Sequence, residues 1–255
     1  MTTIGIIPAR MASSRLPGKP LAKILGMPMI GHVYHRCKMS RALSEVYIAT
    51  CDEEIRAYAE SIGASCIMTA DTHERATDRT AEAMLKIEAQ TGVRTDIVVM
   101  IQGDEPMVFP DMIDQAIAPL AAEPALEVVN LMAGMDDVEE FEDPNEVKVV
   151  VDLKNNALYF SREAVPSRKK GVTKVPMLKQ VCIMPFRREF LLRFNALLQT
   201  PLEIIESVDM MRVLENGGTV RMVPTTRKTW SVDTQEDRAF VEAKMKDDPL
   251  YASYA

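Results

Sequence analysis

Three basic residues in one loop near the start of the chain form the first group that could do chemistry. The segment from Ala9 to Pro20 places Arg10, Arg15 and Lys19 among small residues, directly after an apolar run. Small residues let backbone N–H groups approach a ligand, and the cations neutralise its charge, which is what a polyphosphate requires. The spacings of a Walker A loop and of a GxGxxG dinucleotide loop are both absent. The segment therefore predicts a phosphate-binding loop of another kind.

Two acidic segments could complete such a site. Asp104 lies in Gln102-Gly103-Asp104-Glu105-Pro106, directly after a buried apolar run, and Asp233 follows Trp230-Ser231-Val232 near the end of the chain. Two carboxylates from remote parts of a chain are a usual way to hold a Mg²⁺ ion that also binds phosphates. Each residue has a simpler interpretation, because Asp104 could cap a turn and Asp233 could be the N-cap of a helix. The sequence leaves both alternatives open.

The elements that must position these residues alternate between strand and helix. Strands are expected at 4–7, 46–50, 66–68 and 96–101, and helices at 29–39, 53–63 and 77–91, with Asp52 as the cap of the second helix. This alternation indicates right-handed βαβ units and an α/β fold with a mostly parallel sheet. Ligands bind beyond the carboxyl ends of such strands, so chemistry is expected in the loops at 9–19, 50–52, 69–79 and 102–106.

The second half of the chain is less regular. We expect helices at 111–121, 189–195, 202–216 and 233–246, and strands at 128–132, 147–151, 157–160 and 220–223. No linker divides the chain, so it is interpreted as a single domain over residues 1–255. The last nine residues, 247–255, receive no role.

Composition limits the classes of function. The chain has 255 residues, 47% of them hydrophobic and 26% charged, with a formal net charge of −7. An acidic protein with only local basic clusters is not expected to bind nucleic acid and suits a small anionic ligand. No apolar run approaches the ~20 residues of a membrane span, so no membrane association is expected. The four cysteines are scattered singly, which favours the reducing cytoplasm over a disulfide framework or a zinc site.

Several segments together resemble a known family, the cytidylyltransferases that activate 3-deoxy-manno-octulosonate (Kdo), a sugar acid of lipopolysaccharide. The similar segments are IIPARMASSRLPGKPL, MTADTHERATDRTAE, VMIQGDEPMV, DPNEVKVVVD, ALYFSREAVP, TPLEIIE and SVDTQED. The resemblance implies a Rossmann-like nucleotidyltransferase core with a small sheet insertion, at roughly residues 125–225, that is used for dimerisation. It also implies a homodimer.

The resemblance further implies a reaction and a set of site residues. The anomeric hydroxyl of the sugar acid would attack the α-phosphorus of CTP and release pyrophosphate, with Arg10, Lys19, Asp104 and Asp233 as catalytic residues. Asp104 and Asp233 would bind the cofactor Mg²⁺. The nucleotide-binding residues would be Ala9, Arg10, Ser13, Ser14, Arg15, Lys19, His73, Ala76, Thr77, Arg79 and Asp104. The acceptor-binding residues would be Gln102, Arg162, Gln180, Met184, Glu206 and Asp209.

The chain departs from the family pattern at three places. The usual HQSGTDR stretch is His73-Glu74-Arg75-Ala76-Thr77-Asp78-Arg79, the usual HLGIY is Gln180-Val181-Cys182-Ile183-Met184, and a Glu-Gln pair is Asp209-Met210. The last two changes remove hydrogen-bonding groups from the acceptor half, and a site that binds hydroxyls usually keeps such groups. We therefore hypothesise an altered acceptor: a modified Kdo, another ulosonic acid, or a smaller anionic acceptor such as a phosphonate. The alternative is drift within the insertion with the substrate unchanged.

Two further interpretations compete with this one. A sugar 1-phosphate nucleotidyltransferase usually carries a glycine-rich loop, where this chain has Ala12-Ser13-Ser14. A non-catalytic nucleotide-binding regulator would not need Lys19 together with both Asp104 and Asp233. Both interpretations are therefore weaker than cytidylyl transfer.

Overall fold

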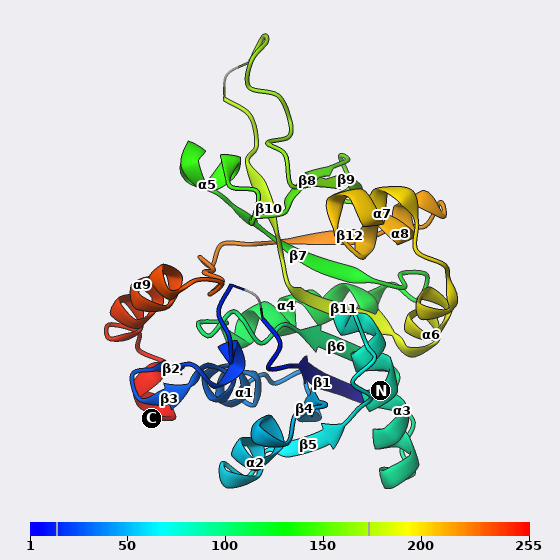
Figure 1. Ribbon diagram of the computed structural model, residues 1–255. Coiled ribbons are helices and arrows are strands. Elements are labelled where there is room, and N and C mark those ends of the chain that lie inside the picture. Colours follow the sequence, from blue (N-terminus) through cyan, green and yellow to red (C-terminus); the bar gives the residue numbers. More distant parts are fainter. Residues whose placement is uncertain (14, 173) are drawn as a thin grey trace. The chain divides into compact units, whose positions relative to one another are not determined.

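The structure is a computed structural model that describes residues 1–13, 15–172 and 174–255 (Figure 1). The described chain separates into two compact units. Unit 1 contains Met1–Asp114 and Thr229–Ala255, and unit 2 contains Gln115–Lys228. Each unit contains a β-sheet.

A parallel sheet forms the centre of unit 1. Its strands lie in the order β6-β1-β4-β5, and all three pairings are parallel. The strands are β1 (Thr3–Pro8), β4 (Glu45–Thr50), β5 (Ser65–Met68) and β6 (Ile97–Ile101). Every residue of β6 is buried, as its unbroken apolar sequence predicts for a strand covered on both faces. The predicted α/β fold with a mostly parallel sheet is confirmed.

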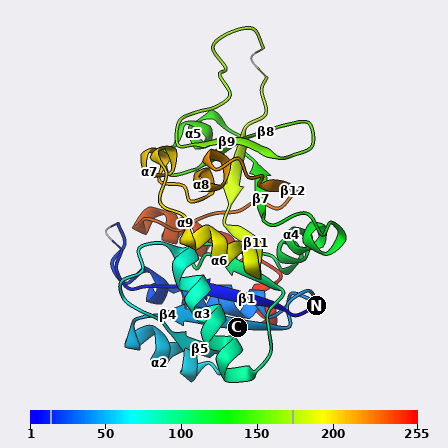
Figure 2. The same ribbon diagram turned by 90° about the vertical axis from the view of Figure 1, so that its right-hand side faces the viewer.

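Helices cover both faces of this sheet. Figure 1 shows α1 (Met29–Cys37) and α2 (Glu53–Ser61) on one side of the strands and α3 (Ala76–Thr91) on the other, and Figure 2 shows α3 lying across them. The sides follow from the strand order, because right-handed crossovers place helices on opposite faces when the chain reverses its direction across the sheet. The reversal occurs between β1 and β6, so a crevice is expected beyond the carboxyl ends of these two strands.

The remaining elements of unit 1 are short or lie near its ends. They are the 3-10 helix η1 (Lys19–Leu21), the hairpin β2 (Lys23–Ile24) with β3 (Met27–Pro28), the helix α9 (Gln235–Met245) and the 3-10 helix η2 (Tyr251–Ser253). The helix α4 (Pro110–Ala122) runs across the boundary between the two units.

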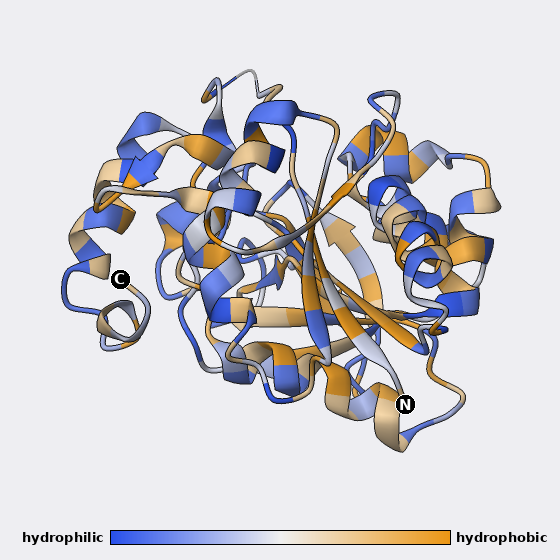
Figure 3. Cartoon of the chain, turned by 90° about the horizontal axis from the view of Figure 1, so that it is seen from below, coloured by the Kyte–Doolittle hydropathy of each residue, from blue (hydrophilic) through white to orange (hydrophobic). Residues whose placement is uncertain are grey.

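A mixed five-stranded sheet forms unit 2, in the order β12-β7-β10-β8-β9. The strands are β7 (Val129–Gly134), β8 (Lys148–Val151), β9 (Ala157–Ser161), β10 (Leu178–Val181) and β12 (Arg221–Thr225), and β11 (Ile183–Arg187) follows β10. The helices are α5 (Val138–Glu142), α6 (Arg188–Ala196), α7 (Pro201–Glu206) and α8 (Met210–Glu215). Figure 3 shows the hydrophobic colour concentrated on strands, with helices of mixed colour.

Sequence reasoning missed β10 and β11. The polar Gln180 and Pro185 interrupt this stretch, and proline within an apolar run usually argues against a strand. The four strands predicted in this half correspond to β7, β8, β9 and β12.

The single helix predicted over 202–216 is wrong. The chain forms two helices, α7 and α8, because Ser207 adopts a left-handed conformation with φ of 53° and ends α7. The Glu203 carboxylate accepts the backbone N–H of Thr200, the N-cap residue of α7, at 3.3 Å. The Glu203 side chain also pairs with Arg212 of α8, with 2.7 Å between Oε2 and Nε, in a buried contact that ties the two short helices together. A periodic pattern cannot reveal such a break, since both helices continue the same apolar spacing.

Candidate active site

The loop that follows β1 is folded against its neighbours. Ala9 is buried and donates its backbone N–H to the Ala49 carbonyl at 2.9 Å, and Met11 donates to the Asp52 carboxylate at 2.7 Å. Asp52 occupies the predicted N-cap position of α2, but its side chain makes no cap hydrogen bond there. The predicted N-cap position is confirmed, but the carboxylate binds the loop after the neighbouring strand instead of the first turn of α2.

The end of the same loop presents Lys19. The Ser13 hydroxyl accepts from the backbone N–H of Leu16 at 3.3 Å, and the backbone N–H of Lys19 donates to the Leu16 carbonyl at 3.0 Å. Gly18 has a φ of 68°, a left-handed conformation that favours glycine, and it turns the chain directly before Lys19. Ser14, one of the expected nucleotide-binding residues, lies outside the described residues.

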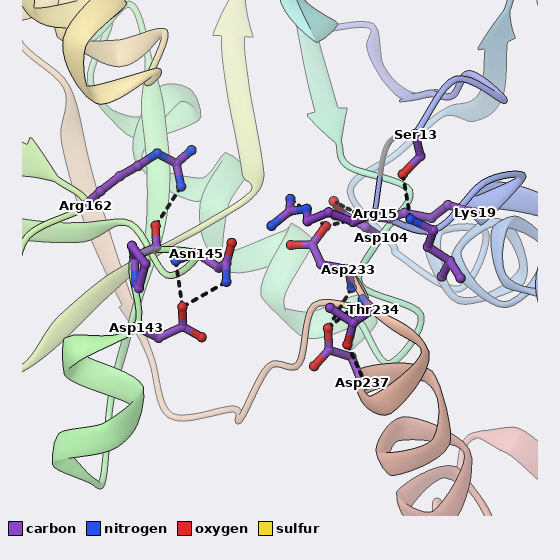
Figure 4. Close-up of polar contacts among 12 residues, drawn as sticks. Ser13, Arg15, Lys19, Asp104, Asp143, Asn145, Arg162, Asp233, Thr234 and Asp237 are labelled. Carbon is purple, nitrogen blue, oxygen red and sulfur yellow. Dashed lines mark hydrogen bonds and ion pairs between the residues drawn. The ribbon is translucent and has the colours of Figure 1, made fainter.

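Four charged side chains meet beyond the carboxyl ends of β1 and β6. The Lys19 ammonium lies 3.1 Å from Asp104 Oδ2 and 2.8 Å from Asp233 Oδ1, and the Arg15 guanidinium lies 3.0 Å from the same Asp233 oxygen (Figure 4). The side chains of Lys19, Asp104 and Asp233 are 14%, 25% and 19% exposed, while Arg15 is 51% exposed. We call Arg15, Lys19, Asp104 and Asp233 the charge cluster.

Thr234, not Asp233, is the N-cap of α9, and the Asp104 carboxylate contacts Lys19. Thr234 forms a capping box with Asp237, and the Asp237 carboxylate also accepts the backbone N–H of Asp233 at 3.0 Å. The Asp233 side chain is therefore available for the cations. The backbone N–H of Val232 donates to the Asp104 carbonyl at 2.9 Å, which joins the two aspartate segments directly. Sequence reasoning identified both aspartates but missed Asp237, whose only signal is the capping-box spacing.

The two carboxylates of the charge cluster stabilise the protonated form of Lys19. Burial acts to lower the pKa of Lys19, but the nearby carboxylates, Asp104 foremost, outweigh it and raise the pKa above its ordinary value. Lys19 is therefore a protonated, positively charged group at neutral pH.

The segment expected to read the nucleotide base surrounds the start of α3. Ala76 is the first residue of the helix and Thr77 is fully buried. Arg79 is buried as well, and its guanidinium donates to the Thr69 hydroxyl and contacts Cys51 Sγ at 3.5 Å. Because Thr69 and Cys51 follow β5 and β4, Arg79 holds the carboxyl ends of these strands together.

His73 is held in place by Glu82 of α3. Its ring nitrogen Nε2 contacts Glu82 Oε2, and the same carboxylate oxygen accepts the backbone N–H of Ala70 at 2.9 Å. Although burial acts to raise it, hydrogen bonds from Lys86, the Ala70 N–H and His73 hold the pKa of Glu82 at about 2. Glu82 therefore anchors the segment before α3, a role that sequence reasoning missed.

In unit 2, the structure brings Arg162 and Glu206 together. The Glu206 carboxylate accepts from the Arg162 backbone N–H at 2.8 Å and from the hydroxyls of Tyr159 and Ser161 at 3.1 Å each. The Arg162 guanidinium donates to the backbone carbonyls of Glu206 and Pro144, both at 2.8 Å. Figure 4 shows this guanidinium near Asp143 and Asn145. Arg162 and Glu206 thus form one polar cluster of unit 2.

The second polar cluster of unit 2 contains Gln180 and Met184. The Gln180 amide nitrogen donates to Asn130 Oδ1 at 2.5 Å and contacts Met184 Sδ at 3.7 Å. Met184 is 3% exposed and packs in the core, whereas Gln180 is half-buried. Asn130 was missed, and its only signal in the sequence is a polar residue inside the apolar run Val128–Met132.

The other expected site residues are placed as follows. Arg10 is exposed on the loop after β1, Gln102 is half-buried directly after β6, and Asp209 occupies the N-cap position of α8. Gln102 belongs to unit 1, whereas Arg162, Gln180, Met184, Glu206 and Asp209 belong to unit 2.

Within residues 1–13, 15–172 and 174–255, no group of three or more His, Cys, Asp or Glu side chains could hold a metal ion. No helix in the described part of the chain has the length and apolar character needed to cross a membrane.

Comparison with known proteins gives a consistent picture. A family model described as "Cytidylyltransferase" matches residues 4–228. The chain is 42% identical over 255 residues to the 3-deoxy-manno-octulosonate cytidylyltransferase of Geobacter metallireducens, with 96% of this chain and 98% of that relative covered. It is 44% identical over 240 residues to the protein of the same name from Nitratidesulfovibrio vulgaris, covering 92% and 93%. A solved structure of CMP:2-keto-3-deoxy-manno-octonic acid synthetase complexed with CTP matches with a TM-score of 0.88 and 36% identity, covering 96% of this chain and 99% of that one.

Proposed function

Because this chain belongs to the 3-deoxy-manno-octulosonate cytidylyltransferase family, we propose that it transfers the cytidylyl group of CTP to Kdo and releases pyrophosphate. The observation that carries the proposal is the charge cluster, in which Lys19 lies within 3.1 Å of both Asp104 and Asp233. This arrangement lies beyond the carboxyl ends of parallel strands, where α/β folds bind nucleotides. The likeness to a relative solved with CTP supports the choice of nucleotide.

The donor set of the charge cluster fits Mg²⁺. Two carboxylates approach one nitrogen, Lys19 Nζ, at 3.1 and 2.8 Å, so both can reach a cation placed between them. Mg²⁺ is commonly held by one or two carboxylates together with substrate phosphates. We propose that Asp104 and Asp233 hold it, and that it neutralises phosphate charge and lowers the pKa of the attacking hydroxyl.

The chain's own residues would orient the reaction. The anomeric oxygen of Kdo forms a bond to the α-phosphorus, the bond from that phosphorus to the bridging oxygen of the β-phosphate breaks, and the hydroxyl proton passes to water. Arg10, Arg15 and Lys19 carry the positive charge that stabilises the triphosphate and the departing pyrophosphate. The segment from His73 to Arg79 is proposed to bind the cytosine, with Glu82 holding His73.

A second candidate is cytidylyl transfer to a different anionic acceptor. The observation in its favour is the pairing of the Gln180 amide with Asn130 and the burial of Met184, at positions where the family pattern has His and Tyr. A modified Kdo, another ulosonic acid or a phosphonate would then be the substrate.

An acceptor panel tests the proposed function. Pyrophosphate release from CTP would be followed with Kdo, other ulosonic acids and phosphonates, each with and without Mg²⁺. The proposal expects the highest kcat/KM with Kdo and a strict requirement for CTP. A higher kcat/KM with another acceptor would identify that acceptor as the substrate in place of Kdo. If no acceptor led to pyrophosphate release, cytidylyl transfer would be contradicted.

Asp104→Asn should reduce kcat by at least about a hundredfold, because the substitution removes one charge from the proposed cation site and electrostatic groups of this kind contribute about two to three orders of magnitude. Pyrophosphate release measures the rate, and circular dichroism checks folding. Asp111→Asn is a control of the same type, at the start of α4. Full activity of Asp104→Asn would contradict its assignment to the metal.

We also propose a homodimer in the cytoplasm. Leu198, Ile204 and Ile205 are 88%, 59% and 73% exposed in unit 2, and exposed apolar side chains on adjoining segments favour a protein partner. The proposed use of CTP as a substrate supports the cytoplasmic location. Analytical ultracentrifugation tests the dimer, and Ile205→Lys should shift it toward the monomer.

A further inference from the structure

The Lys19 ammonium contacts both carboxylates that are proposed to hold the metal ion. Its Nζ is 3.1 Å from Asp104 Oδ2 and 2.8 Å from Asp233 Oδ1, and its side chain is 14% exposed (Figure 4). We propose that Lys19 is a built-in counter-ion of these carboxylates, which must leave before a divalent cation binds and which the triphosphate of the nucleotide draws away. This inference rests on the proposed function, since it takes Asp104 and Asp233 as the metal ligands.

The charge balance of the cluster supports this order of binding. Lys19 and Arg15 contribute two positive charges, and Asp104 and Asp233 contribute two negative charges, so the charge cluster is neutral by itself. A divalent cation that entered alone would add two charges beside an ammonium group. A positive charge next to the site disfavours the binding of a second positive charge. An interaction equivalent to one pKa unit would weaken binding about tenfold.

The nucleotide supplies the missing charge. A triphosphate brings several negative charges to the loop after β1, so it can compensate a divalent cation and both basic side chains at once. Metal and nucleotide should therefore bind together more tightly than either binds alone. Lys19 makes the two events depend on each other.

The structure allows the Lys19 side chain to move without the loop. The Lys19 backbone is fixed at the start of η1, where its N–H donates to the Leu16 carbonyl at 3.0 Å and its carbonyl accepts from Ala22 at 3.1 Å. The ammonium is carried on a flexible four-carbon stem, which can turn from the carboxylates to a phosphate oxygen.

The proposal predicts the effect of removing the Lys19 charge on metal binding without nucleotide. Mn²⁺ would be titrated into the full-length chain, and free Mn²⁺ would be followed by electron paramagnetic resonance. Lys19→Met, which keeps the length of the side chain, should bind Mn²⁺ at least about tenfold more tightly than wild type. Lys23→Met is a matched control, because Lys23 is exposed and close in the chain but lies outside the charge cluster.

One further variant and one further measurement test where the metal binds and whether the nucleotide affects its binding. Asp104→Asn combined with Lys19→Met should lose the gain in Mn²⁺ affinity. Addition of CTP should increase Mn²⁺ binding by the wild type more than by Lys19→Met. The Mn²⁺ that CTP binds in the absence of protein is measured separately and subtracted. The proposal is overturned if Lys19→Met binds Mn²⁺ no more tightly than wild type, or if Lys23→Met shows the same gain. Failure of the proposed function would appear separately, as a wild-type protein that releases no pyrophosphate.

Discussion

At the scale of single residues, Asn130 orients the side chain of Gln180. Its amide nitrogen donates to the carbonyls of Val181 at 2.6 Å and Leu131 at 3.2 Å, so its Oδ1 is the atom that accepts from the Gln180 amide nitrogen. We propose that the carbonyl oxygen of the half-buried Gln180 is then the group that meets the acceptor. Under the proposed function, this position offers a hydrogen-bond acceptor to the sugar acid.

Asn130→Ala should raise KM for the acceptor about fivefold and leave KM for CTP unchanged, because one net hydrogen bond contributes about 1 kcal/mol to placing Gln180. Steady-state kinetics with each substrate varied measures the two constants. In the background of Gln180→Ala, the same substitution should have no further effect on KM for the acceptor. If Asn130→Ala raised KM for the acceptor equally in the wild type and in Gln180→Ala, Asn130 would have a purely structural role and would not act through Gln180.

At the scale of elements, the first turn of α9 is capped by Thr234 rather than by Asp233. Thr234 and Asp237 cap each other across the first turn, and Asp237 Oδ2 accepts the backbone N–H groups of Asp233 and Thr234 at 3.0 and 2.8 Å. The helix therefore fixes the backbone of Asp233 and leaves its carboxylate to Lys19 and Arg15.

Asp237→Ala should raise the Mg²⁺ concentration that gives half-maximal activity severalfold, since Asp233 would lose its fixed backbone. Loss of the cap should also cost about 1 kcal/mol of unfolding free energy. A Mg²⁺ titration of pyrophosphate release measures the first effect. Glu236→Ala is the matched control, because Glu236 is an exposed acidic residue of the same helical turn. The same Mg²⁺ requirement in both variants would contradict the positioning role.

At the scale of the whole molecule, the last residues of the chain help to build unit 1. Arg36 of α1 is fully buried, and its guanidinium pairs with Asp248 and donates to the Tyr254 hydroxyl at 2.9 Å. The His32 ring lies 3.0 Å from the same hydroxyl and 2.8 Å from the Ile24 carbonyl, which connects the tail to the hairpin of β2 and β3. The segment 247–255, which received no role from sequence, therefore anchors α1.

Asp248→Asn should lower the free energy of unfolding by about 3–5 kcal/mol, because it leaves the buried Arg36 charge without its partner. Urea denaturation followed by fluorescence measures this, since Trp230 is the single tryptophan and packs against the core of the same unit. Asp247→Asn is the control at an exposed neighbour and should change stability by less than about 0.5 kcal/mol. Equal stability of the two variants would contradict the anchoring role.

The sequence by itself determined the parallel α/β fold and the charged residues of the site. Apolar strands such as 97–101 are buried on both faces, and polar loops must follow them at the carboxyl edge, so local pattern was sufficient to indicate Lys19 and Asp104. Only the tertiary structure decided which of these charges meet. Lys19 and Asp233 are 214 residues apart in the chain, and no local pattern specifies a contact at that separation.

Other features depended on tertiary structure for the same reason. The break at Ser207, the Asn130–Gln180 pair and the Arg36–Asp248 pair each rest on the conformation or the packing partner of one side chain. Periodicity reports which face of an element is buried, whereas it carries no information about the partner that covers it. The types of the residues and their positions after the strands thus indicated the chemistry of the site. Long-range packing decided which of these residues contact one another.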